Sequence, residues 1–128
     1  MLRVAGAGRS VLLAGDIERE QESALVVAGA ALRSDVLVVP HHGSRTSSSA
    51  AFLDAVHPRI AVVQAGYRNR FGHPAPDVVE RYRERGIAVV ATAACGAWQW
   101  RADGGDDGSC ERDAARRYWH HRIDADPR

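Results

Sequence analysis

Three stretches of the sequence place side chains that can bind a metal ion directly after an apolar run. Asp16 follows Val-Leu-Leu-Ala-Gly, His41 and His42 follow Val-Leu-Val-Val-Pro, and His73 lies in the loop after Ile-Ala-Val-Val-Gln. A carboxylate can bridge two divalent ions, and neutral imidazole suits zinc, manganese or iron. If the apolar runs are strands of one sheet, these side chains follow successive strand ends, and we expect them to share one site.

Each of these side chains also has an ordinary structural interpretation. Asp16 precedes Glu18 and a helical pattern, so it can be the N-cap of a helix. The histidine pair can be a turn in which one ring is a buried hydrogen-bond partner and the other is solvated. His73, beside a glycine and a proline, can be a loop-packing residue. Taken singly, each position leaves both interpretations open.

A hydroxyl-rich run, Ser-Arg-Thr-Ser-Ser-Ser at 44–49, follows the histidine pair and a glycine. Such hydroxyls ordinarily make turns and cap helices, and we expect Ser47 or Ser48 to cap the next helix. A phosphate contact stays open for Ser44, because a hydroxyl beside a glycine can approach an anion closely.

The later loop at 66–74, Gly-Tyr-Arg-Asn-Arg-Phe-Gly-His-Pro, is too rich in polar and aromatic residues to be a simple connection. Its arginines, Arg68 and Arg70, can neutralise DNA phosphates together with Arg45, although loop arginines are more often only solvated. The other histidines fit ordinary surface positions: His57, His120 and His121.

Several functional classes lack their sequence signals. There is no Gly-x-Ser-x-Gly elbow and no glycine-rich phosphate loop, and the net charge of +1 excludes a global basic field. Cys95 and Cys110 form no Cys-x-x-Cys pair, which disfavours a structural zinc site and leaves a disulfide open. We find no signal-peptide pattern and no apolar run of roughly 18 to 20 residues, so we expect a soluble segment.

Apolar periodicity predicts the elements that position these residues. We expect strands over 2–5, 10–14, 35–39, 60–64, 87–92 and 97–101, and helices over 18–32, from the serines to 56, and over 77–85. Helices that alternate with buried strands predict an α/β layered fold, with functional groups on loops at the strand ends.

The chain resembles the C-terminal half of the metallo-β-lactamase-like domain of the ComEC/Rec2 family of DNA-uptake competence proteins, over about residues 2–101. The resemblance rests on LLAGDIE, DVLVVPHHGSRTSSSAAFLDAVHPRIAVVQAG and YRNRFGHPAPDVVERY in this order. The terminal ARRYWHHR is similar to proteobacterial members. The resemblance to the family implies half of an αββα sandwich over residues 1–102, which is a mixed sheet layer with flanking helices. A Gly/Asp loop and an arginine-rich tail would follow over residues 103–128.

The resemblance also implies roles for the candidate residues. Asp16 matches the carboxylate that bridges two metals, and His42 matches a metal-binding histidine before a glycine, with zinc or manganese as the divalent ion. His41 then either supports a metal ligand from beside it or contacts phosphate, although the reverse assignment of the two histidines stays open. Asn69 and His73 would orient a phosphodiester or donate a proton.

One family motif, His-x-His-x-Asp-His, is absent from the sequence, as is a further ligand histidine. Each metal needs about four ligands, so we expect no dinuclear site and no activity in this chain alone. We expect a fragment whose uncovered sheet face exposes apolar surface that invites pairing with another chain.

The resemblance implies DNA uptake during natural transformation, with the intact domain acting as a metal-dependent nuclease. The expected partners are single-stranded DNA, the missing N-terminal half of the domain and the membrane channel of a bacterial inner-membrane protein. Two alternatives stay open: another metallo-β-lactamase-fold phosphodiesterase, such as a phosphorylcholine esterase, and a non-catalytic remnant or interaction module.

Overall fold

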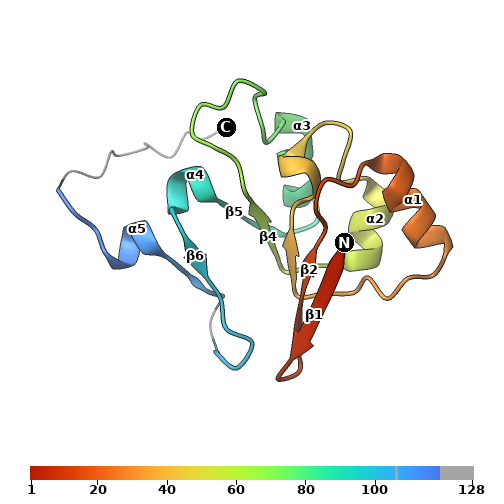
Figure 1. Ribbon diagram of the computed structural model, residues 1–128, viewed down its shortest axis with the longest axis horizontal. Coiled ribbons are helices and arrows are strands. Elements are labelled where there is room, and N and C mark those ends of the chain that lie inside the picture. The colour runs from red at the N-terminus through yellow and green to blue at the C-terminus, as the bar shows by residue number, and fades with distance from the viewer. Residues whose placement is uncertain (106, 119–128) are drawn as a thin grey trace.

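The main sheet has five strands that follow one another in the order of the sequence (Figure 1). The computed structural model describes residues 1–105 and 107–118. The strands are β1 (Leu2–Gly6), β2 (Arg9–Leu13), β3 (Val36–Val38), β4 (Ile60–Val63) and β5 (Ala88–Ala91). β1 and β2 form an antiparallel hairpin, whereas β2 to β5 are parallel. The predicted α/β class is therefore confirmed.

Three helices link the parallel strands and cover one face of the sheet: α1 (Arg19–Val27), α2 (Ala50–Val56) and α3 (Pro76–Arg83). Leu12, Leu37 and Ala61 are register neighbours on this face. They are fully buried against the helices, whose contribution to the core includes Phe52 and Tyr82. Each such large apolar side chain stabilises the fold by roughly 1.5–3 kcal/mol.

Helix α1 ends earlier than the expected span of 18–32. Its last residue is Val27, and Gly29 adopts a left-handed conformation with φ of +63°. Glycine in this conformation stops a helix at little steric cost. The apolar residues that extended the helical pattern, such as Leu32, pack into the core from the connection instead.

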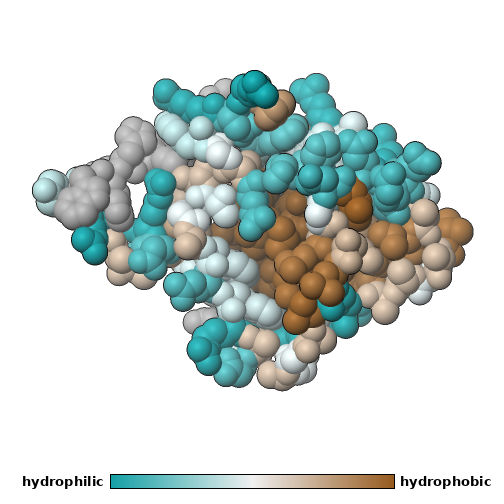
Figure 2. All heavy atoms as spheres, in the orientation of Figure 1, coloured by the Kyte–Doolittle hydropathy of each residue, from teal (hydrophilic) through white to brown (hydrophobic). Residues whose placement is uncertain are grey.

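The opposite face of the sheet is only partly covered. Val36, Ile60 and Val62 are buried there beneath Trp98 and Trp100. The hairpin beside them is open: the exposed fractions are 58% for Leu2, 48% for Val4 and 39% for Leu13. In Figure 2 apolar side chains gather at the surface over the strands at this end of the sheet. We call Leu2, Val4 and Leu13 the open face.

The expected last strand over 97–101 does not join the main sheet. After the short helix α4 (Thr92–Cys95), strand β6 (Trp98–Gln99) pairs antiparallel with β7 (Ser109–Cys110), which leads into α5 (Glu111–Ala114). A disulfide joins Cys95 to Cys110. The predicted domain boundary at 102/103 falls within the β6–β7 connection.

Some of the C-terminal residues that the sequence singles out lie beyond these elements. His120, His121 and the second half of the ARRYWHHR motif, from Trp119 onward, lie outside the described residues. Within the described residues, no helix combines the length and apolar character needed to cross a membrane.

Candidate functional site

The metal-ligand candidates meet at the carboxyl ends of β2, β3 and β4. Asp16 follows β2, the histidine pair lies in a short 3-10 turn (Pro40–Gly43) after β3, and His73 lies in the loop after β4. The ring centroids of His41 and His42 are 6.4 Å apart, and those of His41 and His73 are 6.1 Å apart. The parallel arrangement of these strands thus brings residues 16, 41, 42 and 73 together at one edge.

His42 and Asp16 face each other at the solvent boundary. The Nε2 atom of His42 lies 3.6 Å from the Oδ1 atom of Asp16, with side chains 51% and 73% exposed. Nδ1 of the same ring lies 2.7 Å from the carbonyl oxygen of Gln64. A carbonyl can only accept, so Nδ1 carries the proton in the neutral ring and the Nε2 lone pair faces the carboxylate.

Asp16 is available for this contact because it does not cap helix α1. The N-cap is Glu18, whose backbone N–H donates to the side-chain oxygen of Gln21 at 3.0 Å. The alternative interpretation of Asp16 as an N-cap is therefore wrong, since the helix begins at Arg19, too far along the chain.

His41 has a carboxylate neighbour that sequence reasoning missed. Its Nδ1 atom lies 2.9 Å from Oε1 of Glu18, an electrostatic contact whose geometry falls short of a hydrogen bond. The same oxygen accepts a hydrogen bond from the Thr46 hydroxyl at 2.9 Å. From the sequence, Glu18 could be interpreted only as a residue at the start of a helix. Its sequence neighbours do not indicate that a turn 23 residues later folds against it.

The histidine pair adopts an unusual backbone conformation. His41 has φ 47° and ψ 41°, and His42 has φ 56° and ψ 18°. Both are left-handed, a conformation that costs non-glycine residues roughly 1–2 kcal/mol each. The backbone N–H of His41 donates to the Gly15 carbonyl at 3.0 Å, which ties this turn to the loop before Asp16.

His73 is held from its backbone and packed between rings. Asn69 donates from Nδ2 to the His73 carbonyl at 2.6 Å and accepts from the His73 N–H at 3.0 Å. The Phe71 ring stacks on the His73 ring at 5.8 Å and 18°. Asn69 therefore fixes the backbone of His73.

The electrostatics of the site favour a neutral His73. Burial, and then the nearby charges of His41 and His42, lower the pKa of His73 below its ordinary value. Its Nδ1 atom is buried and has no hydrogen-bond partner among the described residues. A neutral imidazole with an unused nitrogen can accept a proton or bind a cation.

Gly43 brings the two histidine loops into contact. Its φ is +81°, and a Cβ at this position would lie 2.7 Å from Cβ of Pro74. The Gly43 carbonyl accepts a hydrogen bond from the Ala75 N–H at 2.9 Å. Any larger residue would separate the loop of His73 from the turn of His41 and His42, which explains the glycine after the histidine pair.

The serine run is clamped by residues that sequence reasoning missed. Both oxygens of Glu22, which is fully buried, accept backbone N–H bonds, from Ser48 at 2.6 Å and Ser49 at 2.8 Å. On the other side, Arg81 donates to the Ser47 and Ser48 carbonyls at 2.9 and 2.7 Å. The expectation that Ser47 or Ser48 caps the helix is wrong, because Ser49 is the N-cap and Glu22 satisfies these N–H groups.

The hydroxyls inside this run are used within the protein. Burial raises the pKa of the Tyr82 phenol, whose protonated oxygen lies 2.9 Å from the Ser48 hydroxyl. Ser47 donates to the Pro40 carbonyl at 2.9 Å. Ser44 is buried, with its hydroxyl 3.0 Å from that of Thr46.

The three candidate arginines lie at the surface. Arg45 is 79% exposed and its Nε lies 3.7 Å from Asp77 Oδ1. Arg68 and Arg70 are exposed on the loop after β4, each over an aromatic ring. All three remain accessible to a ligand anion.

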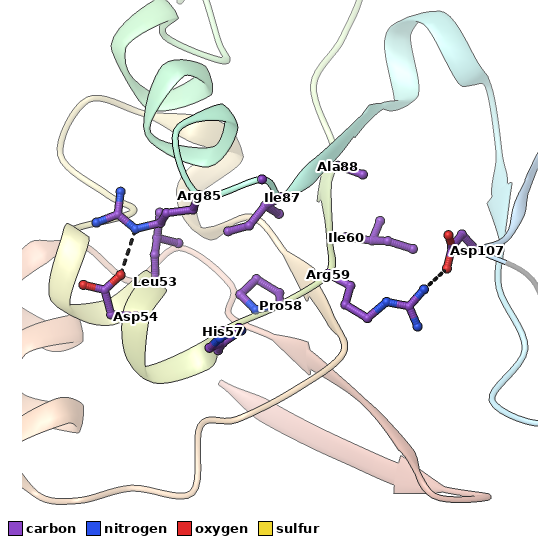
Figure 3. Close-up of a pocket in the computed structure, with 11 residues that line it drawn as sticks. Leu53, Asp54, His57, Pro58, Arg59, Ile60, Arg85, Ile87, Ala88 and Asp107 are labelled. Carbon is purple, nitrogen blue, oxygen red and sulfur yellow. Dashed lines mark hydrogen bonds and ion pairs between the residues drawn. The ribbon is translucent and has the colours of Figure 1, made fainter.

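A separate cavity of about 480 Å³ lies where the chain enters β4 and β5 (Figure 3). Its two arginines are already paired, Arg59 with Asp107 at 2.5 Å and Arg85 with Asp54 at 2.8 Å. Among the described residues that line it, none was predicted to belong to the functional site. This cavity is distinct from the histidine cluster.

The site offers part of a metal-ligand set. Two ligands about 2.0–2.1 Å from a tetrahedral ion are about 3.4 Å apart, close to the separation of Asp16 and His42. Across residues 1–105 and 107–118, however, no group of three or more His, Cys, Asp or Glu side chains is arranged to hold a metal. These residues therefore fit two positions of a metal site and do not complete one.

Comparison with curated proteins identifies relatives of this chain. It is 45% identical to Competence protein ComA of Neisseria gonorrhoeae over 101 residues, which is 78% of the chain. It is 35% identical to ComE operon protein 3 of Bacillus subtilis over 73% of the chain, and 40% identical to Recombination protein 2 of Haemophilus influenzae over 68%. The chain belongs to the ComEC/Rec2 family.

The match covers a small part of each family member. It spans 15% of the gonococcal protein, 12% of the Bacillus protein and 11% of the Haemophilus protein. No protein-family model matches the chain. Family membership therefore rests on these ComEC/Rec2 relatives, and the predicted resemblance is confirmed at the level of the family.

Proposed function

We propose that this chain serves DNA uptake as part of a ComEC/Rec2-type competence protein, and that it supplies one edge of a metal-dependent phosphodiesterase site. The observation that carries the proposal is the pairing of Asp16 with Nε2 of His42, beside His41 and His73, at the ends of parallel strands. Relatives named as competence and recombination proteins support a role in handling DNA.

Asp16 and His42 would hold the divalent ion, zinc or manganese. When bound, such an ion supplies an activated water and stabilises charge on the phosphate. The bond from His42 Nδ1 to the Gln64 carbonyl fixes the ring so that Nε2 faces the ligand position. The further ligands would come from the rest of the family polypeptide.

The remaining residues of the site would handle the phosphodiester itself. His73, kept neutral, would accept or donate a proton at its imidazole, held in place by Asn69. His41 would contact a phosphate oxygen. Its Nδ1 atom lies 2.9 Å from the Glu18 carboxylate, and this contact holds the ring at the site.

Exposed arginines would guide the DNA backbone toward these groups. Arg45, Arg68 and Arg70 carry fixed positive charges at the surface, and each phosphate that they neutralise releases a counterion. Ser44, whose hydroxyl now bonds Thr46, would contribute only if that bond is exchanged for one to phosphate.

The architecture supports the proposal that residues 1–102 form half of a metallo-β-lactamase-like sandwich. The open face and a groove of about 440 Å³ beneath Trp98 and Trp100 leave apolar surface for a second sheet layer. The other half of the domain is the proposed occupant, in a protein attached to the inner membrane through its channel. Covering the open face would bury side chains that are now in water.

A second candidate is a non-catalytic interaction module. The absence of a three-ligand cluster among the described residues favours it for this chain alone. The two candidates differ in one requirement, because an interaction module needs the fold and the open face but does not need the imidazole of His42.

The test exploits the identity to the gonococcal protein. The 101-residue matched stretch of that protein is replaced by the corresponding residues of this chain, and transformation by DNA is counted. We expect the chimera to transform, and His42→Ala to lower the frequency at least about a hundredfold, as loss of a metal ligand would. The control is His57→Asn, in the cavity of Figure 3, which keeps a residue that tolerates left-handed φ. Transformation by the His42→Ala chimera at the parent frequency would contradict a catalytic site and favour the interaction module.

A further inference from the structure

The loop after β4 presents two aromatic rings to solvent, each with an arginine over its face. Tyr67 is 46% exposed and Phe71 is 66% exposed. The guanidinium carbon of Arg68 lies 5.2 Å from the Tyr67 ring centroid, and that of Arg70 lies 4.8 Å from the Phe71 centroid. We call these four residues the aromatic ledge.

The aromatic ledge is continuous with the histidine cluster. Phe71 stacks on His73, with ring centroids 5.8 Å apart and an interplanar angle of 18°. His73 in turn lies 6.1 Å from His41, which lies 6.4 Å from His42. A series of neighbouring rings thus leads from the exposed surface to the pair formed by Asp16 and His42.

Core packing does not account for these side chains. Phe71 and Tyr67 belong to neither hydrophobic cluster of the described residues, whereas Phe52 and Tyr82 are buried in the main one. A single exposed aromatic residue is ordinary, but two of them interleaved with arginines on one short loop form a pattern with a known use. Aromatic faces stack on nucleobases, and guanidinium groups bind the adjoining phosphates.

We propose that the aromatic ledge binds unpaired nucleotides: a base takes the place of the Arg70 guanidinium over the Phe71 ring, and Arg68 and Arg70 hold the flanking phosphates. The site would therefore take single-stranded DNA in preference to duplex, because the faces of paired bases are already covered by their neighbours in the stack. This inference rests on the proposed function, since it makes DNA the substrate and names its form.

The test measures binding of the whole 128-residue chain to three fluorescent probes of equal length: oligothymidine, an abasic strand with the same phosphates, and duplex DNA. We expect oligothymidine to bind more tightly than the other two. Phe71→Ala should weaken oligothymidine binding about tenfold, the loss of one base stack, and leave the abasic strand unchanged. Phe71→Trp should keep or raise the preference for oligothymidine.

Arginine variants give an independent readout. Arg70→Ala should weaken binding to both single strands and lower the slope of log affinity against log salt by about 0.7, the value for one phosphate contact on a single strand. Tyr118→Ala is the matched control, because Tyr118 is an aromatic residue 96% exposed outside the ledge. It should change neither affinity nor slope.

Several results would overturn the inference. They are equal binding of oligothymidine and the abasic strand, equal binding of duplex, an equal loss on both strands for Phe71→Ala, or no binding of oligothymidine at low salt. If the binding test fails but transformation by the chimera depends on His42, only the proposed role of the aromatic ledge is contradicted. If oligothymidine binds more tightly than the abasic strand but transformation by the chimera does not depend on His42, only the proposed catalytic function is contradicted.

Discussion

Two consecutive histidines hold left-handed backbone conformations at the centre of the candidate site. Such conformations persist only where surrounding contacts fix them, here the bonds from His41 N–H to Gly15 and from His42 Nδ1 to Gln64. In these conformations the two rings point to different carboxylates. His42 faces Asp16, and His41 faces Glu18.

This strain predicts an order of stability among His42 variants. His42→Gly and His42→Ala both lose the ring, but only glycine adopts φ of 56° without steric cost. We expect the glycine variant to be about 1 kcal/mol more stable than the alanine variant. Urea denaturation of both proteins measures the difference, and coincident midpoints would show that the turn stores no such strain.

The titration of His73 offers a second prediction at the residue scale. Because its pKa is lowered in the folded protein, protonation opposes folding, and its contribution to stability falls as the pH drops below the ordinary value of 6.5. NMR titration should place the pKa of His73 below the ordinary value of 6.5. The His41→Gln substitution should raise the pKa of His73, because it removes a neighbouring charge. A His73 pKa unchanged by that substitution would contradict the electrostatic contact between the rings.

At the scale of elements, helices α1 and α3 clamp the serine run between Glu22 and Arg81. The fully buried carboxylate of Glu22 satisfies two N–H groups at the start of α2. This clamp fixes the end of the segment that begins with His41 and His42.

Replacing the buried carboxylate should destabilise the protein. Glu22→Gln keeps the size but turns one accepting oxygen into a donor that faces an N–H group, so we expect a loss of about 2–4 kcal/mol. Glu20→Gln, on the exposed face of the same helix, is the control and should stay within about 0.5 kcal/mol. Thermal or urea unfolding distinguishes them, and equal stabilities would mean that the Glu22 bonds contribute nothing.

The contact between the two histidine loops predicts a further contrast. Gly43 and Gly72 both have positive φ, but only at Gly43 would a Cβ meet another residue within 4 Å, namely Pro74. Gly72→Ala should therefore cost about 1 kcal/mol for the backbone alone, and Gly43→Ala at least about 1 kcal/mol more. Gly43→Ala should also shift the His73 NMR signals. Similar costs for the two variants would indicate that the loops do not touch.

The strands and helices of the main sheet could be predicted because local periodicity reports burial directly. The runs ending at Leu13, Val38 and Val63 are apolar, and the order of the elements determines a parallel layer with the candidates at one edge. The placement of Asp16, His42 and His73 at one edge could therefore be predicted from sequence.

What could not be predicted depends on contacts between distant segments. Nothing near Glu18 or Glu22 in sequence indicates that one meets His41 and the other is buried under the serine run. The pairing of β6 with β7 was missed because each strand has only two residues, too few to show a period.

On the scale of the whole molecule, the open face is an exposed apolar surface. Leu2 and Val4 lie on the edge strand β1, whose outer backbone groups have no neighbouring strand in the five-stranded sheet. Edge strands with exposed apolar residues tend to pair with other chains.

The purified chain should consequently self-associate with rising concentration. The double variant Leu2→Thr and Val4→Thr should reduce association without lowering stability, because both side chains are already about half exposed. Sedimentation velocity measures this. A wild-type chain that remains monomeric throughout would show that the open face needs no cover.

The proposed metal site requires Asp16 and His42 to share a cation. The direct measurement is paramagnetic broadening of backbone NMR signals as Mn²⁺ is added to the 128-residue chain. We predict that signals of residues 16 and 42 broaden first, and that Asp16→Asn or His42→Ala abolishes this. Broadening confined to the acidic loop of Asp103 and Asp107, with none at residues 16 and 42, would contradict the proposed metal site.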